Sequence, residues 1–212
     1  GILMYFKYYN FFIDNVNTLA HSIGWNYSLS ALALILPIGL SFHTFQAMSY
    51  TIEVYRGNQQ AEKHFGIYAL YVMFYPQLVA GPIERPQNVL YQFYERHSLN
   101  YADVSLGMQR IVWGLFKKVV IADNLAQFVT PVYEHASEVS WMYLALAVVF
   151  FSFQIYCDFS GYSDIAIGTA RVMGFRLMEN FKLPYRSSGV GMFWSKWHIS
   201  LSTWFRDYVY IP

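Results

Sequence analysis

The sequence predicts an all-α membrane protein whose helices form a polytopic transmembrane bundle. The first observation is a shortage of charge: 13% of the 212 residues are charged, whereas 56% are hydrophobic and 20% are aromatic. A typical soluble domain carries about 25% charged residues, so these few could not cover a soluble surface of this size. The second observation is that uncharged residues form stretches about as long as the roughly 20 helical residues that cross a bilayer core.

The same composition excludes several classes of protein. Disorder is excluded because 18 Phe, 19 Tyr and 6 Trp residues require burial. A formal net charge of +1 does not suit a nucleic-acid-binding protein, so we expect no nucleic-acid partner. The single cysteine, Cys157, excludes a disulfide framework, and no histidine has the spacing of metal ligands, so no metal site is predicted.

Three windows without a charged residue are long enough to span a bilayer: residues 29–50, 64–83 and 139–157. The last is the cleanest. Pro37 and Gly39 should kink the first, and Pro76 and Gly81 should break the second near its end. Residues 1–13 have the composition of the end of a further span.

A fourth apolar segment, residues 107–129, carries Arg110, Lys117, Lys118 and Asp123. It is either a shorter interfacial helix or a span packed inside protein whose cations reach toward the membrane surface.

The pattern contains no internal repeat and predicts one membrane domain across residues 1–212. Because the chain begins with Gly1 rather than Met and ends within an aromatic segment, we expect it to be part of a longer protein. The polar connectors are residues 53–63, 84–103, 131–140 and 176–189.

Residues 75–86 contain three prolines and a glycine, which exclude a regular helix. One interpretation is a span that ends in a loop, with Glu84 and Arg85 among the lipid headgroups. The alternative is irregular backbone whose polar groups are satisfied by protein or by a water-filled cavity.

Residues 154–168 combine acidic and small residues directly after the cleanest window. We expect one helix to end near Asp158 and another to begin near Ser163, because Ser163 could cap a helix and Asp164 suits its first turn. The alternative is a polar notch in the membrane core, where carboxylates are costly and therefore usually functional.

Residues 193–208, read as one helix, form an aromatic face beside a polar stripe. The aromatic face contains Trp194, Trp197, Leu201, Trp204, Phe205 and Tyr208, and the stripe contains Ser195, His198, Ser202 and Arg206. This pattern predicts either an amphipathic helix that lies in the membrane interface or a helix that lines a cavity, with His198 turned inward.

Six blocks resemble the membrane-bound O-acyltransferase family. Their order and density across the chain are more specific than any single motif, and the most similar branch is that of the bacterial polysaccharide O-acetyltransferases of the alginate-acetylating type. The blocks are residues 197–212 (WHISLSTWFRDYVYIP), 156–168 (YCDFSGYSDIAIG), 175–181 (FRLMENF), 36–42 (LPIGLSF), 53–57 (EVYRG) and 78–82 (LVAGP).

The resemblance implies a ring of membrane helices around a tunnel, of which this chain is a part. It implies transfer of an acyl group to a hydroxyl from a thioester donor, such as acetyl-CoA or an acyl carrier, without a bound cofactor. In the polysaccharide branch it further implies a multi-pass protein of the cell (inner or plasma) membrane. The acetyl group would cross the lipid bilayer to extracytoplasmic acetyltransferase partner proteins and the polysaccharide acceptor.

The resemblance also implies two prominent histidines, one of which matches His198. The other, the main catalytic one, is expected in a block beyond residue 212, so this chain should be incomplete for activity on its own. Histidine suits this chemistry because it exchanges a proton near neutral pH. We therefore expect His198 to support the site, and we favour the cavity-lining interpretation of its helix. The other residues expected to line the tunnel are Trp197, Ser200, Ser202, Arg206 and Asp207, with Asp158 and Tyr162 as weaker candidates.

Two alternatives remain open at this point. The same fold could transfer D-alanine to teichoic acid or acylate a lipid or a protein. A non-enzymatic membrane transporter would instead show paired, inverted, broken segments, and the sequence has no matching repeat.

Overall fold

The computed structural model describes residues 2–25, 28–32, 39–78 and 81–211, and within these ranges the chain is helical without a β-strand. The all-α prediction is therefore confirmed for the described residues. The α-helices are α1 (Ile2–Ser22), α2 (Leu40–Tyr55), α3 (Phe65–Val72), α4 (Pro86–Val89), α5 (Tyr101–Leu115), α6 (Asp123–Glu134), α7 (Trp141–Val172), α8 (Val190–Trp194) and α9 (Ile199–Phe205). Short 3₁₀ turns lie at Tyr75–Gln77, Leu90–Tyr94 and Pro184–Arg186, and π-helical turns lie at Phe116–Ala122 and Arg206–Tyr210.

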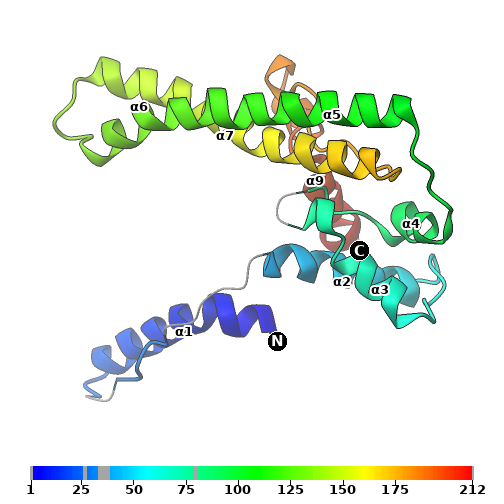
Figure 1. Cartoon of the computed structure of the whole chain (residues 1–212). Helices are drawn as coiled ribbons and strands as arrows, with labels where there is room; N and C mark the ends of the chain where they lie inside the picture. Colours follow the sequence, from blue (N-terminus) through cyan, green and yellow to red (C-terminus); the bar gives the residue numbers. More distant parts are fainter. Residues whose placement is uncertain (1, 26–27, 33–38, 79–80, 212) are drawn as a thin grey trace.

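The dominant feature is a pair of long antiparallel helical rods. The π-helical turn over Phe116–Ala122 joins α5 to α6 without a break, so residues 101–134 form the first rod. The second rod is α7, whose 32 residues extend about 48 Å at 1.5 Å per residue. Figure 1 shows α7 returning alongside α6 and α5.

Glycines let these two rods touch at the backbone. A Cβ atom added to Gly114 would lie 2.7 Å from the carbonyl oxygen of Gly161, and one added to Gly107 would lie 2.7 Å from the carbonyl oxygen of Gly168. The two glycines of each rod are seven residues apart, which places them on one face of the helix. The antiparallel pairing is therefore specified by two matched pairs of glycines.

In the part of the chain described, α7 is the one helix long and apolar enough to cross a membrane. Its first half coincides with the predicted window 139–157. The other two windows yield shorter helices, since α2 has 16 residues and α3 has eight. Residues 33–38 of the first window, including the expected kink at Pro37, lie outside the described residues. The multi-span bundle therefore stays a prediction.

The segment after α3 is irregular but packed within protein. The helix ends at Val72, before the prolines that were expected to break it. Across this segment, the Tyr71 hydroxyl donates to the Glu84 carbonyl oxygen at 2.8 Å. The Glu84 side chain is 1% exposed. It is thus buried in protein rather than placed among lipid headgroups, which favours the second interpretation of this segment.

The expected helix break between Asp158 and Ser163 is wrong, because α7 runs through both residues. The small residues there serve close packing instead: a Cβ on Gly161 would lie 2.8 Å from the carbonyl oxygen of Gly114. The carboxylates of the block are paired with cations from the first rod, so they need no helix terminus. The helix therefore continues across the polar block.

The single helix expected over residues 193–208 is also wrong. The chain is non-helical between α8 and α9, and His198 has the left-handed backbone angle φ = 44°. The physical reason is a competing partner: the Lys196 carbonyl oxygen and the Ile199 N–H bond to residues 180–182 instead of to the helix. Ser195 consequently belongs to a different element from Ser202, and the predicted polar stripe does not exist.

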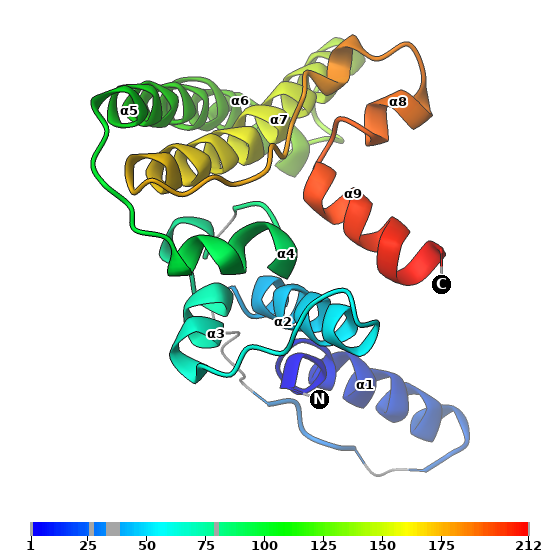
Figure 2. The same ribbon diagram turned by 90° about the vertical axis from the view of Figure 1, so that its right-hand side faces the viewer.

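Helices α1 to α4 lie to one side of the two rods. Figure 2 shows α2, α3 and α4 between α1 and the pair formed by α5 and α7, with α9 descending past α4. Two asparagines of α1, Asn10 and Asn17, exchange paired hydrogen bonds of 2.8–2.9 Å with the backbone of Leu32 and Leu29. These bonds hold the following extended segment along α1.

Candidate functional site

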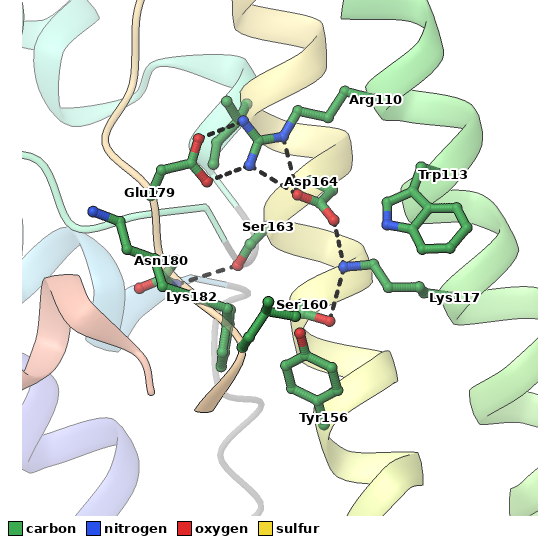
Figure 3. A pocket seen from close by; sticks show the side chains of 13 residues that line it. Arg110, Trp113, Lys117, Tyr156, Ser160, Ser163, Asp164, Glu179, Asn180 and Lys182 are labelled. Carbon is green, nitrogen blue, oxygen red and sulfur yellow. Dashed lines mark hydrogen bonds and ion pairs between the residues drawn. The ribbon is translucent and has the colours of Figure 1, made fainter. Parts of the chain in front are cut away.

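A polar pocket opens where α7 faces α5 and the non-helical segment after α7. The cavity measures about 320 Å³, and Figure 3 shows its polar side chains converging from the three segments. It is lined by Arg110, Trp113, Lys117, Tyr156, Ser160, Ser163, Asp164, Ile167, Glu179, Asn180, Phe181, Lys182 and Leu183.

An ion-pair network organises one wall of this pocket. Arg110 donates from Nε to Asp164 Oδ1 at 3.0 Å and from Nη1 to Glu179 Oε1 at 2.6 Å. Lys117 is 8% exposed, pairs with the other oxygen of Asp164 and donates to Ser160 Oγ at 2.9 Å. Arg110 and Lys117 are thus both paired with carboxylates of neighbouring segments. They neutralise carboxylates that would otherwise be costly to bury.

A second network links the pocket to α9 through Asn180. This side chain is 1% exposed. Its Nδ2 donates to Ser163 Oγ at 3.2 Å, while its Oδ1 accepts from Ser200 Oγ at 3.0 Å and from Ser200 N at 3.2 Å. The predicted residue Ser200 is therefore buried in a structural hydrogen-bond network beside the pocket.

His198 immediately precedes α9 and packs against two aromatic rings. The centroid of its imidazole lies 4.5 Å from that of Phe159, with the rings perpendicular, and 6.4 Å from that of Phe181, with the rings stacked. Burial lowers the pKa of His198 from 6.5 to about 4. The imidazole is consequently neutral at physiological pH, with one nitrogen able to accept a proton and the other able to donate a hydrogen bond.

The neighbouring predicted residues surround the backbone of His198. The Trp197 ring lies 5.2 Å from Phe181 and 5.5 Å from Phe193 by their centroids. Ser202 Oγ donates to the Trp197 carbonyl oxygen at 3.0 Å. The structure therefore brings together Trp197, His198, Ser200 and Ser202.

Arg206 and Asp207 lie at the other end of α9, apart from this group. Asp207 accepts from Arg85 Nη2 at 3.1 Å and from Arg206 Nε at 2.7 Å. The Arg206 side chain is otherwise exposed, at 60%. These two residues link separate segments of the chain. Like His198, they are not among the residues that line the polar pocket.

Asp158 and Tyr162 also lie apart from His198. The Asp158 carboxylate is 2.8 Å from Lys118 Nζ, and the same ammonium lies 5.5 Å from the centroid of the Tyr162 ring. Tyr162 lines a different hollow of about 240 Å³, together with Pro76 and Gly81. Neither weaker candidate reaches the pocket that Figure 3 shows.

Sequence reasoning did not select Arg110, Lys117, Glu179 or Asn180 as site residues. A signal for two of them was present, because Arg110 and Lys117 are seven residues apart and share a helix face within an apolar segment. Glu179 and Asn180 lie outside any helix, so no periodicity marked them. Within the described ranges, no group of three His, Cys, Asp or Glu residues is arranged to hold a metal ion.

Comparison with known proteins identifies similar sequences. The model of the membrane-bound O-acyltransferase family matches residues 63–212. The probable alginate O-acetylase of Pseudomonas putida is 44% identical over 215 residues, which cover 100% of this chain and 43% of the relative. The peptidoglycan O-acetyltransferase of Helicobacter pylori is 37% identical over 238 residues, which cover 100% of this chain and 44% of the relative.

A relative with lower identity is named for the transfer of a different group, D-alanine. The teichoic acid D-alanyltransferase of Bacillus subtilis is 30% identical over 185 residues, covering 84% of this chain and 46% of the relative. The chain thus spans less than half the length of each of these relatives.

Proposed function

This chain belongs to the membrane-bound O-acyltransferase family, and from this premise we propose that the protein containing it acetylates hydroxyls of an exported, alginate-like polysaccharide. The similarity to the alginate and peptidoglycan O-acetylating relatives supports this choice, because it extends over the whole chain at 37–44% identity. The proposal includes a multi-pass position in the cell membrane, with residues 1–212 as part of one membrane domain.

The chemistry requires a thioester donor and a group that manages protons. The acceptor hydroxyl oxygen forms a bond to the thioester carbonyl carbon, the carbon–sulfur bond breaks, and the hydroxyl proton passes through a base to the thiolate. We propose acetyl-CoA or an acylated carrier as the donor. Extracytoplasmic acetyltransferase proteins are the proposed partners that complete delivery to the polymer.

We assign His198 the role of a supporting residue in this reaction. A neutral imidazole held between aromatic rings can orient a hydroxyl by hydrogen bonding without first losing a proton. Trp197, Ser200 and Ser202 would shape its surroundings. The main base is the histidine that we expect beyond residue 212.

The half-buried, neutral His198 is the observation that carries this proposal, and it can be tested in the full-length protein. Replacing His198 with Ala should lower polymer acetylation by at least tenfold at equal membrane expression, as expected for loss of a positioned proton-handling group. Polymer-bound acetate would be measured, with His135→Ala as the matched control because His135 is exposed and lies at the end of α6. Unchanged acetylation in His198→Ala would contradict the assigned role.

D-alanyl transfer to teichoic acid is the second candidate, supported by the 30% identical relative of that name. The two functions differ in the group that is transferred. Purified full-length protein would be incubated with labelled acetyl-CoA or with a D-alanylated carrier, and the label on each acceptor measured. Label from acetyl-CoA on polysaccharide supports the first candidate, whereas no covalent transfer from either donor would favour a transporter.

A further inference from the structure

Helix α9 begins without a cap from its own sequence. His198 occupies the N-cap position but makes no capping hydrogen bond with its side chain. The first N–H groups of any helix lack an acceptor within the helix and need one from elsewhere. Asn180 supplies these acceptors. Its backbone carbonyl oxygen accepts from Ile199 N at 2.9 Å, and its side-chain Oδ1 accepts from Ser200 N at 3.2 Å.

Asn180 is in turn held by the long helix α7. Its Nδ2 donates to Ser163 Oγ, and Ser163 is 2% exposed. A buried amide with donors and acceptors on both sides has one favourable orientation. The contact therefore fixes the start of α9 relative to α7.

Two backbone hydrogen bonds on either side of His198 constrain its conformation. Lys182 N donates to the Lys196 carbonyl oxygen at 3.0 Å, and Ile199 N donates to the Asn180 carbonyl oxygen. Residues 197 and 198 lie between these two bonds. His198 has φ = 44°, a left-handed conformation that costs a non-glycine residue of the order of 1–3 kcal/mol. Such a conformation persists only where its surroundings hold it, and it directs the imidazole against Phe159.

We propose that Asn180 is a positioning residue for His198, acting as an external cap for α9. The proposal rests on the proposed function only for its effect on acetylation; the effect on the orientation of His198 stands on the contacts alone. An amide side chain does not exchange a proton near neutral pH, so Asn180 is not assigned a catalytic role. Its role is to keep the imidazole at its place beside Phe159 and Phe181.

The first test compares kinetic constants in the full-length protein. Asn180→Ala should lower kcat for acetyl transfer about 10- to 100-fold while the KM for the donor changes less than about twofold, because misplacement by about 1 Å costs up to 100-fold. Asn180→Asp keeps the Oδ acceptor for Ser200 and should recover most of that loss. Asn124→Ala is the matched control, since Asn124 is exposed and bonds to its own helical segment.

The second test measures His198 directly and does not depend on turnover. The rate of carbethoxylation of His198 would be followed by peptide mass spectrometry as a function of pH. Asn180→Ala should raise the rate severalfold and move its midpoint from about 4 toward 6.5, because the imidazole becomes more solvated. Ser163→Ala removes only the hydroxyl that accepts from Asn180 Nδ2, so it should produce a smaller change in the same direction. This variant replaces Asn180→Ala in the test if Asn180→Ala does not fold.

The outcomes separate this inference from the proposed function. Carbethoxylation of His198 that stays unchanged in folded Asn180→Ala, or in Ser163→Ala if the alanine variant does not fold, would overturn the positioning role. If Asn180→Ala alters that reactivity while His198→Ala leaves acetylation unchanged, the positioning role stands and the role of His198 in acetylation is wrong.

Discussion

The carboxyl group of Glu84 lies in the irregular segment between α3 and α4 and is buried against the segment after α7. It accepts from Met178 N at 2.5 Å and is 1% exposed. Burial raises its pKa from 4.5 to about 7, although the bond from Met178, the contact with Asn88 and the charge of Arg85 all favour ionisation. The charged form therefore costs the folded protein more than the protonated form.

A pH dependence of stability follows from this raised pKa. The stabilising contribution is fully present below about pH 4.5 and is lost as the pH rises through 7. In detergent, the thermal midpoint of Glu84→Gln should fall less than that of the unaltered protein between pH 5 and pH 8. The control is Glu95→Gln, since Glu95 is exposed. Identical pH profiles for Glu84→Gln and the unaltered protein would contradict this account.

Residue types were easier to predict than their conformations. His198 and Trp197 could be selected from the sequence because their motif resembles a family block. The left-handed backbone of His198 could not, because it depends on hydrogen bonds to residues 180–182, which are distant in sequence and have no periodic pattern.

At the scale of elements, helix α7 explains both a success and a failure of sequence reasoning. Its apolar first half was predicted because hydrophobicity and length alone identify a span. Its continuity was not, because Ser163 and Gly161 are common both at helix ends and in tightly packed helix interiors. Here the residues lie in a packed helix interior, because Gly114 and Gly107 of α5 face Gly161 and Gly168 of α7. This pairing of glycines from two helices is visible only in the folded structure.

The close approach of α5 and α7 predicts a strong effect of side chains at Gly114. Gly114→Val would place a Cβ atom 2.7 Å from a carbonyl oxygen and 3.0 Å from a backbone nitrogen of α7, so the helices must separate. Such overpacking costs about 1–3 kcal/mol or more. Gly191→Val is the control, because nothing lies within 4 Å of a Cβ added there.

The measurement is the midpoint of chemical or thermal unfolding of both variants in detergent. We expect a clear loss for Gly114→Val and a small change for Gly191→Val. Equal midpoints for the two variants would show that the helices do not touch at this glycine.

At the scale of the whole molecule, three segments that are far apart in the sequence meet in one polar cluster. Glu53 of α2 accepts from the Tyr208 hydroxyl at 2.8 Å and from Gln87 Nε2 at 2.5 Å. The guanidinium of Arg85 lies 4.5 Å from the centroid of the Tyr208 ring and pairs with Asp207. The resemblance marked two of these segments, residues 53–57 and 197–212, but no pattern within either segment indicated that they contact each other.

The pair between Arg85 and Asp207 is the contact of this cluster that a mutant cycle can isolate. Its partners are 122 residues apart in sequence, and their side chains are 15% and 32% exposed. Partial solvent screening reduces the attraction, whereas the stacking of Arg85 on Tyr208 holds the guanidinium in place. We expect Arg85→Met and Asp207→Asn each to destabilise the protein, and the double variant to lose less than their sum.

The expected coupling is about 0.5–1.5 kcal/mol, within the range found for residues in contact. It would be measured from unfolding midpoints of the four proteins at low and high salt. A coupling that decreases with added salt identifies the ion pair, because mobile ions screen charges that are partly exposed. Purely additive effects would mean that the end of α9 is attached to the segment before α4 by the stacked ring of Tyr208 rather than by charge.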